Sequence, residues 1–263
     1  MPIFHAQGWS HFFTLAFLTL LEGARQRLVV VLLGILLVGL SLAGFAGALA
    51  ITEAREVRST LLGAFLRFAA ALLTALYVLH SQFRAYHDKG LEQLFSLPLT
   101  RTVYLFGKLA GYGLLIMIMV GLFSGVLLFF APPLQVALWG GSLLLELWIV
   151  AAFSFWVQLT IRSFPAAFLM VLFFYVLART LTSLQLVGQG AIMPQHSPYF
   201  QAINAVLAAI GFILPGLDRF TRSEWLAYGS GQWEDLLFVC GQGVIYLMLL
   251  AALALIDLYR KSL

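Results

Sequence analysis

The sequence predicts an all-α membrane protein with six transmembrane helices, preceded by an amphipathic helix that lies in the membrane interface. The chain has 263 residues, of which 62% are hydrophobic and only 10% are charged, whereas soluble domains are about half apolar and a quarter charged. Apolar runs long enough to cross a bilayer recur along the whole length, and most of the charged residues lie between them. We therefore expect a single membrane domain over residues 1–263 and no separate soluble domain.

The N-terminal stretch, residues 9–25, has the pattern of an interfacial helix. Its apolar residues recur at the spacing of one helical face, and these are Trp9, Phe12, Phe13, Ala16, Phe17, Leu20, Leu21 and Ala24. Ser10, His11, Thr14, Glu22 and Arg25 lie off that face. A short seventh span is the alternative, but the charged sequence EGARQR that follows favours a helix lying in the plane of the membrane.

The six spans are expected near residues 28–50, 61–83, 104–130, 134–160, 164–184 and 236–258. Pro132 and Pro133 predict the turn between the third and fourth spans. Residues 185–235 form a long segment between the last two spans. Within it, an apolar helical repeat from Tyr199 to Leu214 stops at Pro215-Gly216, which indicates an interfacial or partly re-entrant helix.

Lys and Arg residues predict the orientation of these spans. If both termini are cytoplasmic, nine basic residues lie in cytoplasmic segments and four lie outside, which agrees with the positive-inside rule. Residues 185–235 are then extracytoplasmic, and residues 84–103 are cytoplasmic. The net charge of +4 belongs to these span ends, so we expect no nucleic-acid partner.

The polar segment after the second span is too charged to cross the membrane. Residues 84–108 carry six ionised side chains, and inserting them would cost on the order of 15 kcal/mol. Pro98 ends a short helix that carries Leu91, Leu94 and Phe95 on one face, and Thr100 or Thr102 can cap the next helix. Two interpretations of that apolar face fit equally: a surface for a partner protein, or a contact with the membrane interface or neighbouring spans.

This segment, "LEQLFSLPLTRTVYLFGK", resembles the loop between the second and third spans of type-2 ABC transporter permeases. In that family a Gly-Leu-Glu-x-Leu run meets an S-x-P-x-[ST]-R turn, and a Tyr and a Gly-Lys open the next span. The matching positions are Gly90, Leu91, Glu92, Leu94, Ser96, Pro98, Thr100, Arg101, Tyr104, Gly107 and Lys108. The number of spans, the N-terminal helix and the long segment before the last span are also similar to the family.

The resemblance implies a permease subunit of an exporter in a bacterial inner membrane. It implies that residues 84–103 form a coupling loop that docks on a separate ATP-binding cassette subunit. The residues it assigns to that contact are Gly90, Leu91, Glu92, Leu94, Phe95, Pro98 and Arg101. It also implies that two permease chains, as a homodimer, form the translocation path between them.

The chain lacks the motif needed to bind ATP by itself. Its one Gly-Lys pair, Gly107-Lys108, is followed by Leu109 and has no P-loop glycine upstream. A single cysteine, Cys240, excludes an internal disulfide and any site built from several cysteines. We therefore expect no cofactor, no metal site and no enzymatic activity in this chain, with ATP hydrolysis in a partner subunit.

Glu146 is the charged residue nearest the centre of a span, and such residues are functional candidates. It can be protonated, paired with a basic residue of another span, or face a polar cavity. Arg67, His80 and Arg179 lie nearer span ends, where long side chains can reach the interface. Two alternative functions would use Glu146: an intramembrane enzyme, together with His80 or His196, or an ion-driven secondary transporter.

The third span also carries two small-residue pairs, Gly107-x-x-x-Gly111 and Gly121-x-x-x-Gly125, which allow close helix packing. Because such pairs are common in spans by chance, they are a weak signal.

Overall fold

The computed structural model describes residues 3–25, 28–87, 100–189 and 198–260, and over these ranges it is helical without a strand. Six helices are long and apolar enough to cross a membrane, which confirms the predicted fold class. They are α2 (Leu28–Leu49), α3 (Ala54–His87), α5 (Arg101–Leu127), α6 (Pro133–Thr160), α7 (Phe164–Gln189) and α10 (Trp233–Arg260). The shorter elements are α1 (Ile3–Arg25), α8 (Pro198–Ile213), the 3-10 turn η1 (Leu217–Arg219) and α9 (Ser223–Tyr228).

Local sequence explains where several helices begin and end. Thr100 is the N-cap of α5, and its side chain accepts a hydrogen bond from the Val103 amide at 3.4 Å. Pro133 is the first residue of α6, a position where its fixed φ and missing N–H cost nothing. Gly229 ends α9 with φ +65°, a left-handed conformation that glycine adopts without strain.

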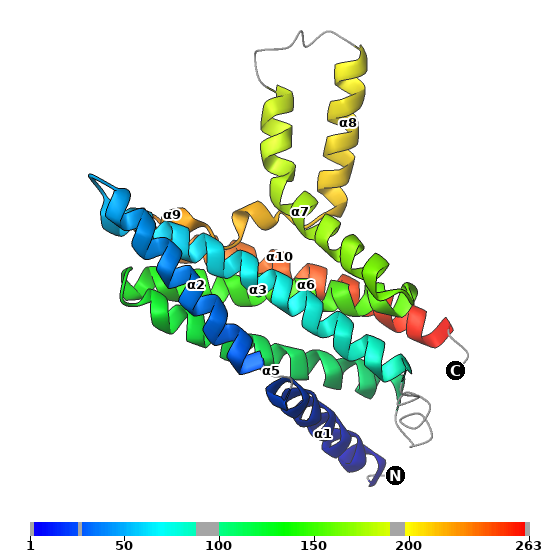
Figure 1. Cartoon of the computed structure of the whole chain (residues 1–263). Helices are drawn as coiled ribbons and strands as arrows, with labels where there is room; N and C mark the ends of the chain where they lie inside the picture. Colours follow the sequence, from blue (N-terminus) through cyan, green and yellow to red (C-terminus); the bar gives the residue numbers. More distant parts are fainter. Residues whose placement is uncertain (1–2, 26–27, 88–99, 190–197, 261–263) are drawn as a thin grey trace.

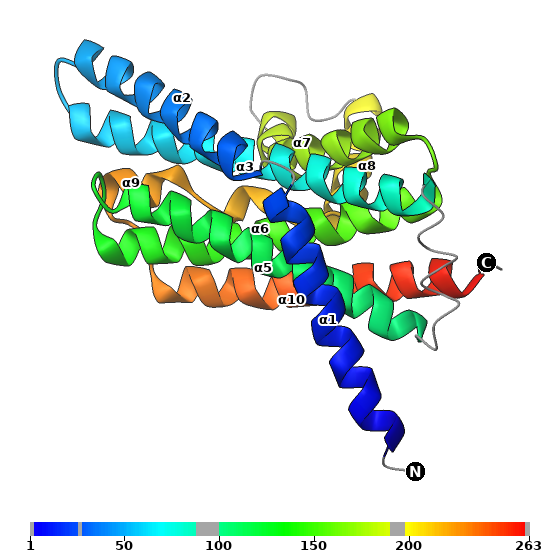
Figure 2. The ribbon, with the colours of Figure 1, turned by 60° about the horizontal axis from the view of Figure 1, so that its bottom comes forward.

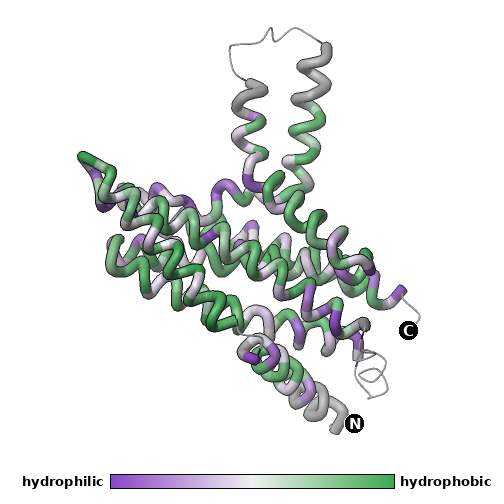
Figure 3. The backbone as a smooth tube through the Cα atoms, viewed as in Figure 1, coloured by the Kyte–Doolittle hydropathy of each residue, from purple (hydrophilic) through white to green (hydrophobic). Residues whose placement is uncertain are grey.

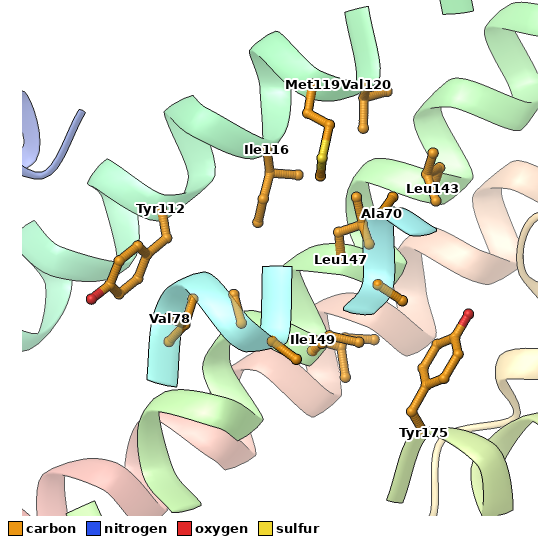
Figure 4. Close-up of a cluster of buried hydrophobic side chains, with 14 of the residues drawn as sticks. Ala70, Val78, Tyr112, Ile116, Met119, Val120, Leu143, Leu147, Ile149 and Tyr175 are labelled. Atoms are coloured by element: carbon orange, nitrogen blue, oxygen red, sulfur yellow. The ribbon is translucent and has the colours of Figure 1, made fainter. Parts of the chain in front are cut away.

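The spans form a bundle around α6 (Figures 1 and 2). In the apolar window of α6, 72% of the residues are buried, whereas the share is 22% in α2 and in α10, so α6 is the central helix. Ala70 and Val78 of α3, Ile116 of α5 and Leu147 of α6 meet in one apolar cluster beside it (Figure 4). Most of the surface of α2 and α10 faces outward and is apolar, as expected for helices in contact with lipid (Figure 3).

We call the end of the bundle where α3 ends and α5 begins the proximal end. The distal end is the one where α2 meets α3 and α5 meets α6. At the proximal end, Asp257 of α10 accepts hydrogen bonds from the Trp156 indole at 2.8 Å and the Thr160 hydroxyl at 3.0 Å. These bonds fix the last turn of α10 against the end of α6.

The segment before the last span is partly folded into the bundle. The second half of α7 and the whole of α8 project from the bundle as a pair (Figure 1), and Gln185 donates to the Leu207 carbonyl at 3.1 Å between them. The chain then returns through η1 and α9, where Leu217, Phe220 and Trp225 are buried. The α8 helix ends just before Pro215-Gly216, as the sequence predicts.

The helix ends differ from their predicted positions in one place that matters for the site. The predicted polar loop 84–103 is shorter than expected, because α3 continues to His87 and α5 begins at Arg101. Residues 100–103 belong to the cap and first turn of α5.

Helix α1 packs across α5 through part of its apolar surface. Leu15, Ala16 and Thr19 are buried, whereas Phe13 and Phe17 are 64% and 58% exposed. The sequence predicts that the apolar residues of this helix, Phe13 and Phe17 among them, share one face that lies against the membrane. The structure divides them between α5 on one side and the outer surface on the other.

Candidate functional site

The predicted coupling residues lie at one end of the bundle, and most are outside the described residues. Gly90, Leu91, Glu92, Leu94, Phe95 and Pro98 belong to residues 88–99, which the structure does not describe. Arg101 is described: its Nη1 atom donates to the Leu258 carbonyl of α10 at 2.5 Å, and its guanidinium lies 5.5 Å from the centre of the Tyr259 ring. Arg101 therefore joins the start of α5 to the end of α10.

The base of this segment is held by a close contact between α5 and α1. A Cβ atom added to Gly111 would lie 2.5 Å from the Thr19 Cβ and 2.9 Å from the Ala16 carbonyl oxygen. At Gly107 the nearest atom would be the Leu15 Cβ, at 3.0 Å. The pair Gly107-x-x-x-Gly111 is therefore the surface on which α1 packs. A Cβ atom added to Gly121 or Gly125 would have no neighbouring atom from elsewhere in the described structure within 4 Å.

An ion pair crosses the same interface. The Lys108 Nζ atom lies 3.5 Å from one carboxylate oxygen of Glu22, and Arg84 of α3 lies 4.0 Å from the other. Ser81 of α3 also donates to Glu22, at 3.2 Å. Glu22 lies off the predicted apolar face of the N-terminal helix, and the structure places it between α3 and α5.

Hydroxyl and amide groups extend this contact into a network between α1, α3 and α5. The Tyr77 hydroxyl donates to the Thr19 carbonyl at 3.0 Å. Gln82 donates to the Tyr112 hydroxyl at 2.8 Å and accepts from Tyr104 at 3.2 Å. We call this set the proximal network; it comprises Thr19, Glu22, Tyr77, Ser81, Gln82, Arg84, Tyr104, Lys108 and Tyr112.

The proximal network has a mechanical consequence. The helices α3 and α5 are the two elements on either side of residues 88–99, and both are bonded to α1. Buried polar groups that satisfy one another hold helices in one arrangement, because separating them would leave donors and acceptors unpaired. A displacement applied at the base of residues 88–99 would therefore move α1, α3 and α5 together.

A second polar cluster surrounds Glu146 in the middle of α6. Glu146 is 0% exposed, and its carboxylate accepts a hydrogen bond from the Tyr175 hydroxyl at 2.9 Å and another from the Thr221 hydroxyl. Arg179 of α7 completes the set with an ion pair at 3.5 Å. Of the three alternatives for Glu146, the structure thus shows pairing with a basic residue of another span.

The basic residues of this central cluster also hold the returning segment. Arg179 donates to the carbonyl oxygens of Leu217 at 2.5 Å and Phe220 at 2.9 Å. Arg67 of α3 donates to the Thr221 carbonyl at 2.8 Å. Arg67 and Arg179 therefore turn inward instead of extending towards the ends of their spans. Backbone carbonyls offset the second guanidinium charge, for which the cluster contains no second carboxylate.

Thr221 is the centre of the cluster, and its backbone is unusual. Its φ is +47°, a left-handed conformation that a β-branched residue rarely adopts. Its amide donates to the Ser142 hydroxyl at 2.6 Å, and its carbonyl and hydroxyl bind Arg67 and Glu146. Interactions with three helices thus hold one residue in a strained conformation, and the segment 217–221 is fixed inside the bundle.

This geometry gives Glu146 a structural role in the described state. Both carboxylate oxygens are bonded and the side chain is inaccessible to solvent. His80 packs edge-on against Phe164 with ring centres 6.3 Å apart, at the start of α7 and apart from the central cluster. Within the described ranges, no group of three or more His, Cys, Asp or Glu residues is placed to hold a metal ion.

The sequence marks several charged members of the two polar clusters, but it does not predict which residues pair with which. Arg67, Glu146 and Arg179 stand out as charges within spans, whereas Glu22 only lies off the apolar face of residues 9–25 and no pattern singles out Thr221. The contacts join residues that are distant in the chain, and no local pattern marks them.

The chain was also compared with known proteins. No protein-family model matches the sequence, and no curated protein matches it. The structure by itself shows six helices that are long and apolar enough to cross a membrane.

Proposed function

We propose that this chain is the membrane-spanning permease subunit of an ATP-driven ABC transporter of the type-2 exporter class. In this proposal residues 90–101 contact a separate ATP-binding cassette subunit, and a second copy of the chain completes the translocation path. The membrane is a bacterial inner membrane, with both termini and the proximal end on the cytoplasmic side.

The observation that carries the proposal is the docking of α1 on α3 and α5, the two helices between which residues 88–99 lie in the chain. Tyr104, Gly107 and Lys108 belong to the stretch that resembles the family, and all three contact other helices at the base of that segment. The missing side chain of Gly107 allows α1 to pack closely, Lys108 pairs with Glu22, and Tyr104 bonds to α3 through Gln82. A displacement of residues 88–99 would thus be transmitted to three helices at once, as an energy-coupling element requires.

The central cluster around Glu146 also supports this proposal. It fixes residues 217–221 to α3, α6 and α7, so a movement that begins at the proximal end of α3 can reach the distal half of the bundle. The alternatives that use Glu146 as an enzymatic acid or an ion site would need that carboxylate to reach substrate or water. In the described structure both of its oxygens are bonded inside the protein.

Site-specific photo-cross-linking tests the proposed partner. A photoreactive residue at position 94 of the full chain is expected to capture a polypeptide that carries a P-loop, identified by mass spectrometry. The same residue at position 51, which is fully exposed at the distal turn between α2 and α3, is the control and should not capture it.

The captured ATPase then provides the functional readout. Leu94→Asp and Phe95→Asp should abolish co-purification and the stimulation of ATP hydrolysis, while the permease still inserts into the membrane. If coupling survives both substitutions, or position 94 captures no P-loop protein, the assignment of this segment is wrong.

A further inference from the structure

The proximal half of the bundle contains an apolar groove that neither polar cluster uses. It has a volume of about 450 Å³ and lies between α5 and α10, with Trp148 of α6 as its floor and Phe12 of α1 at one side. The small side chains of Ala110, Ala251 and Ala252 leave the space between the two helices unfilled at this point. The volume is within the range of about 300–1,000 Å³ that is usual for small-ligand sites.

The chemistry of the walls excludes a polar ligand in the groove itself. Every lining residue is apolar apart from the indole N–H of Trp148, and that group donates to the Leu109 carbonyl at 3.5 Å. The groove opens to the outside of the bundle, since Met248 is 68% exposed and Phe106 is 47% exposed. Its surroundings at this depth are the hydrocarbon of the membrane, because α5 and α10 are spans.

The length of the groove matches a single lipid chain. Its lining on α10 runs from Leu247 to Leu255, and eight steps of a helix cover about 12 Å. One leaflet of a bilayer contributes about half of a hydrocarbon core of roughly 30 Å. The groove ends near the proximal end of α10, so a chain lying in it would place its headgroup at the proximal surface.

A positive charge lies where that headgroup would be. Tyr259 follows Leu255 by one turn on the same face of α10, and the Arg101 guanidinium lies 5.5 Å from the centre of the Tyr259 ring. The same guanidinium bonds to the Leu258 carbonyl, which fixes its position at the end of the groove. A guanidinium binds phosphate oxygens strongly, and its charge favours an anionic headgroup.

We propose that this groove is a binding site for an anionic phospholipid, with one acyl chain between α5 and α10 and the headgroup phosphate beside Arg101. The site shares Arg101 with the proposed coupling segment, but lipid binding itself requires neither an ATPase nor a transported substrate.

Fluorescence quenching by brominated lipid tests the proposal, because Trp148 lies in the groove. The full chain is reconstituted in nanodiscs of phosphatidylcholine, and phosphatidylglycerol brominated on its acyl chains is added in increasing proportion. The signal of Trp148 is the difference between the wild-type protein and Trp148→Phe. Brominated phosphatidylglycerol should reach half-maximal quenching at an about fivefold lower mole fraction than brominated phosphatidylcholine. A factor of this size corresponds to the attraction of one nearby basic group for an anionic headgroup.

Three variants separate the site from general contact with lipid. Arg101→Gln should remove the preference for phosphatidylglycerol, and Arg101→Lys, which keeps the charge, should retain it. Ala252→Phe should fill the groove and protect Trp148 from quenching. Gly241→Phe is the matched control on the same helix and should leave quenching unchanged. A Cβ atom added at Gly241 would have no neighbouring side chain or helix within 4 Å.

Several outcomes would overturn the proposal. An unquenched Trp148 in the wild-type protein would mean that a second copy or another part of this chain covers the groove. Equal quenching by the two lipids would show that the site does not select an anionic headgroup. Wild-type quenching in Ala252→Phe would place the lipid outside the groove.

Discussion

The Nζ atom of Lys108 lies 3.5 Å from the Oε2 atom of Glu22, and their side chains are only 11% and 25% exposed. This ion pair joins the N-terminal helix to the span that follows the candidate coupling segment. Arg84 and Ser81 of α3 approach the same carboxylate. One acidic residue thus connects three helices, and its removal is the most direct test of the proximal network.

Glu22→Gln and Lys108→Met should each lower the thermal midpoint, because each breaks the Glu22–Lys108 ion pair and leaves the remaining, poorly solvated charge less well compensated. We expect about 2 kcal/mol of destabilisation for each, below the 3–5 kcal/mol of fully buried pairs. The double variant should cost less than the sum of the single changes. Tryptophan fluorescence during thermal unfolding in detergent measures this, and Glu224→Gln at an exposed position is the control. Strictly additive losses would show that the two residues do not interact.

Gly111→Val should displace α1 from α5, since its Cβ would lie 2.5 Å from the Thr19 Cβ. Overpacking of this kind costs about 1–3 kcal/mol, and hydrogen exchange in α1 should increase. Gly121→Val is the matched control on the same helix, because a Cβ atom added there would have no neighbouring side chain or helix within 4 Å. Equal effects of the two substitutions would contradict the packing of α1 on this face.

Glu146→Leu should strongly destabilise the protein, by about 3–5 kcal/mol, because it leaves the Arg179 guanidinium buried without its counter-ion. Adding Arg179→Met should recover part of the loss, since the unpaired charge is then removed. Thermal unfolding of the wild-type protein and the two variants measures the recovery. If Glu146→Leu is as stable as the wild-type protein, the central cluster does not depend on the ion pair.

Ser142→Ala should loosen the returning segment without touching any charge. The Thr221 amide would lose its acceptor, and an unsatisfied buried N–H costs about 1–3 kcal/mol. Hydrogen exchange over residues 217–228 should accelerate. Ser41→Ala is the control, because the Ser41 hydroxyl is exposed and bonds only within its own helix. No change in exchange would mean that Thr221 is held by its other contacts.

The positions of the spans could be predicted from the sequence, because a helix needs only sufficient length and apolar character to cross the membrane. The N-cap at Thr100 and the start of α6 at Pro133 also follow from local chemistry. Which faces are buried could not be predicted in the same way. Lipid and protein interior are both apolar, so Phe13 and Phe17 on the surface look the same in the sequence as Leu15 in the interior.

The partners within the polar clusters could not be predicted from the sequence either. Glu146 stands out because a charge within a span is expensive. Its partners Arg179 and Thr221 come from later parts of the chain, and the left-handed conformation of Thr221 is imposed by contacts with three helices. Such a residue is recognised only when the fold brings those contacts together.

The docking of α1 also sets an order for biogenesis. Helix α1 is synthesised before its partners: the Tyr77 hydroxyl that binds its Thr19 carbonyl comes 58 positions later, and its ion-pair partner Lys108 comes later still. The contacts that fix α1 can therefore form only after α3 and α5 have been synthesised. The docking of an early helix thus depends on later ones, and it completes the proximal end of the domain.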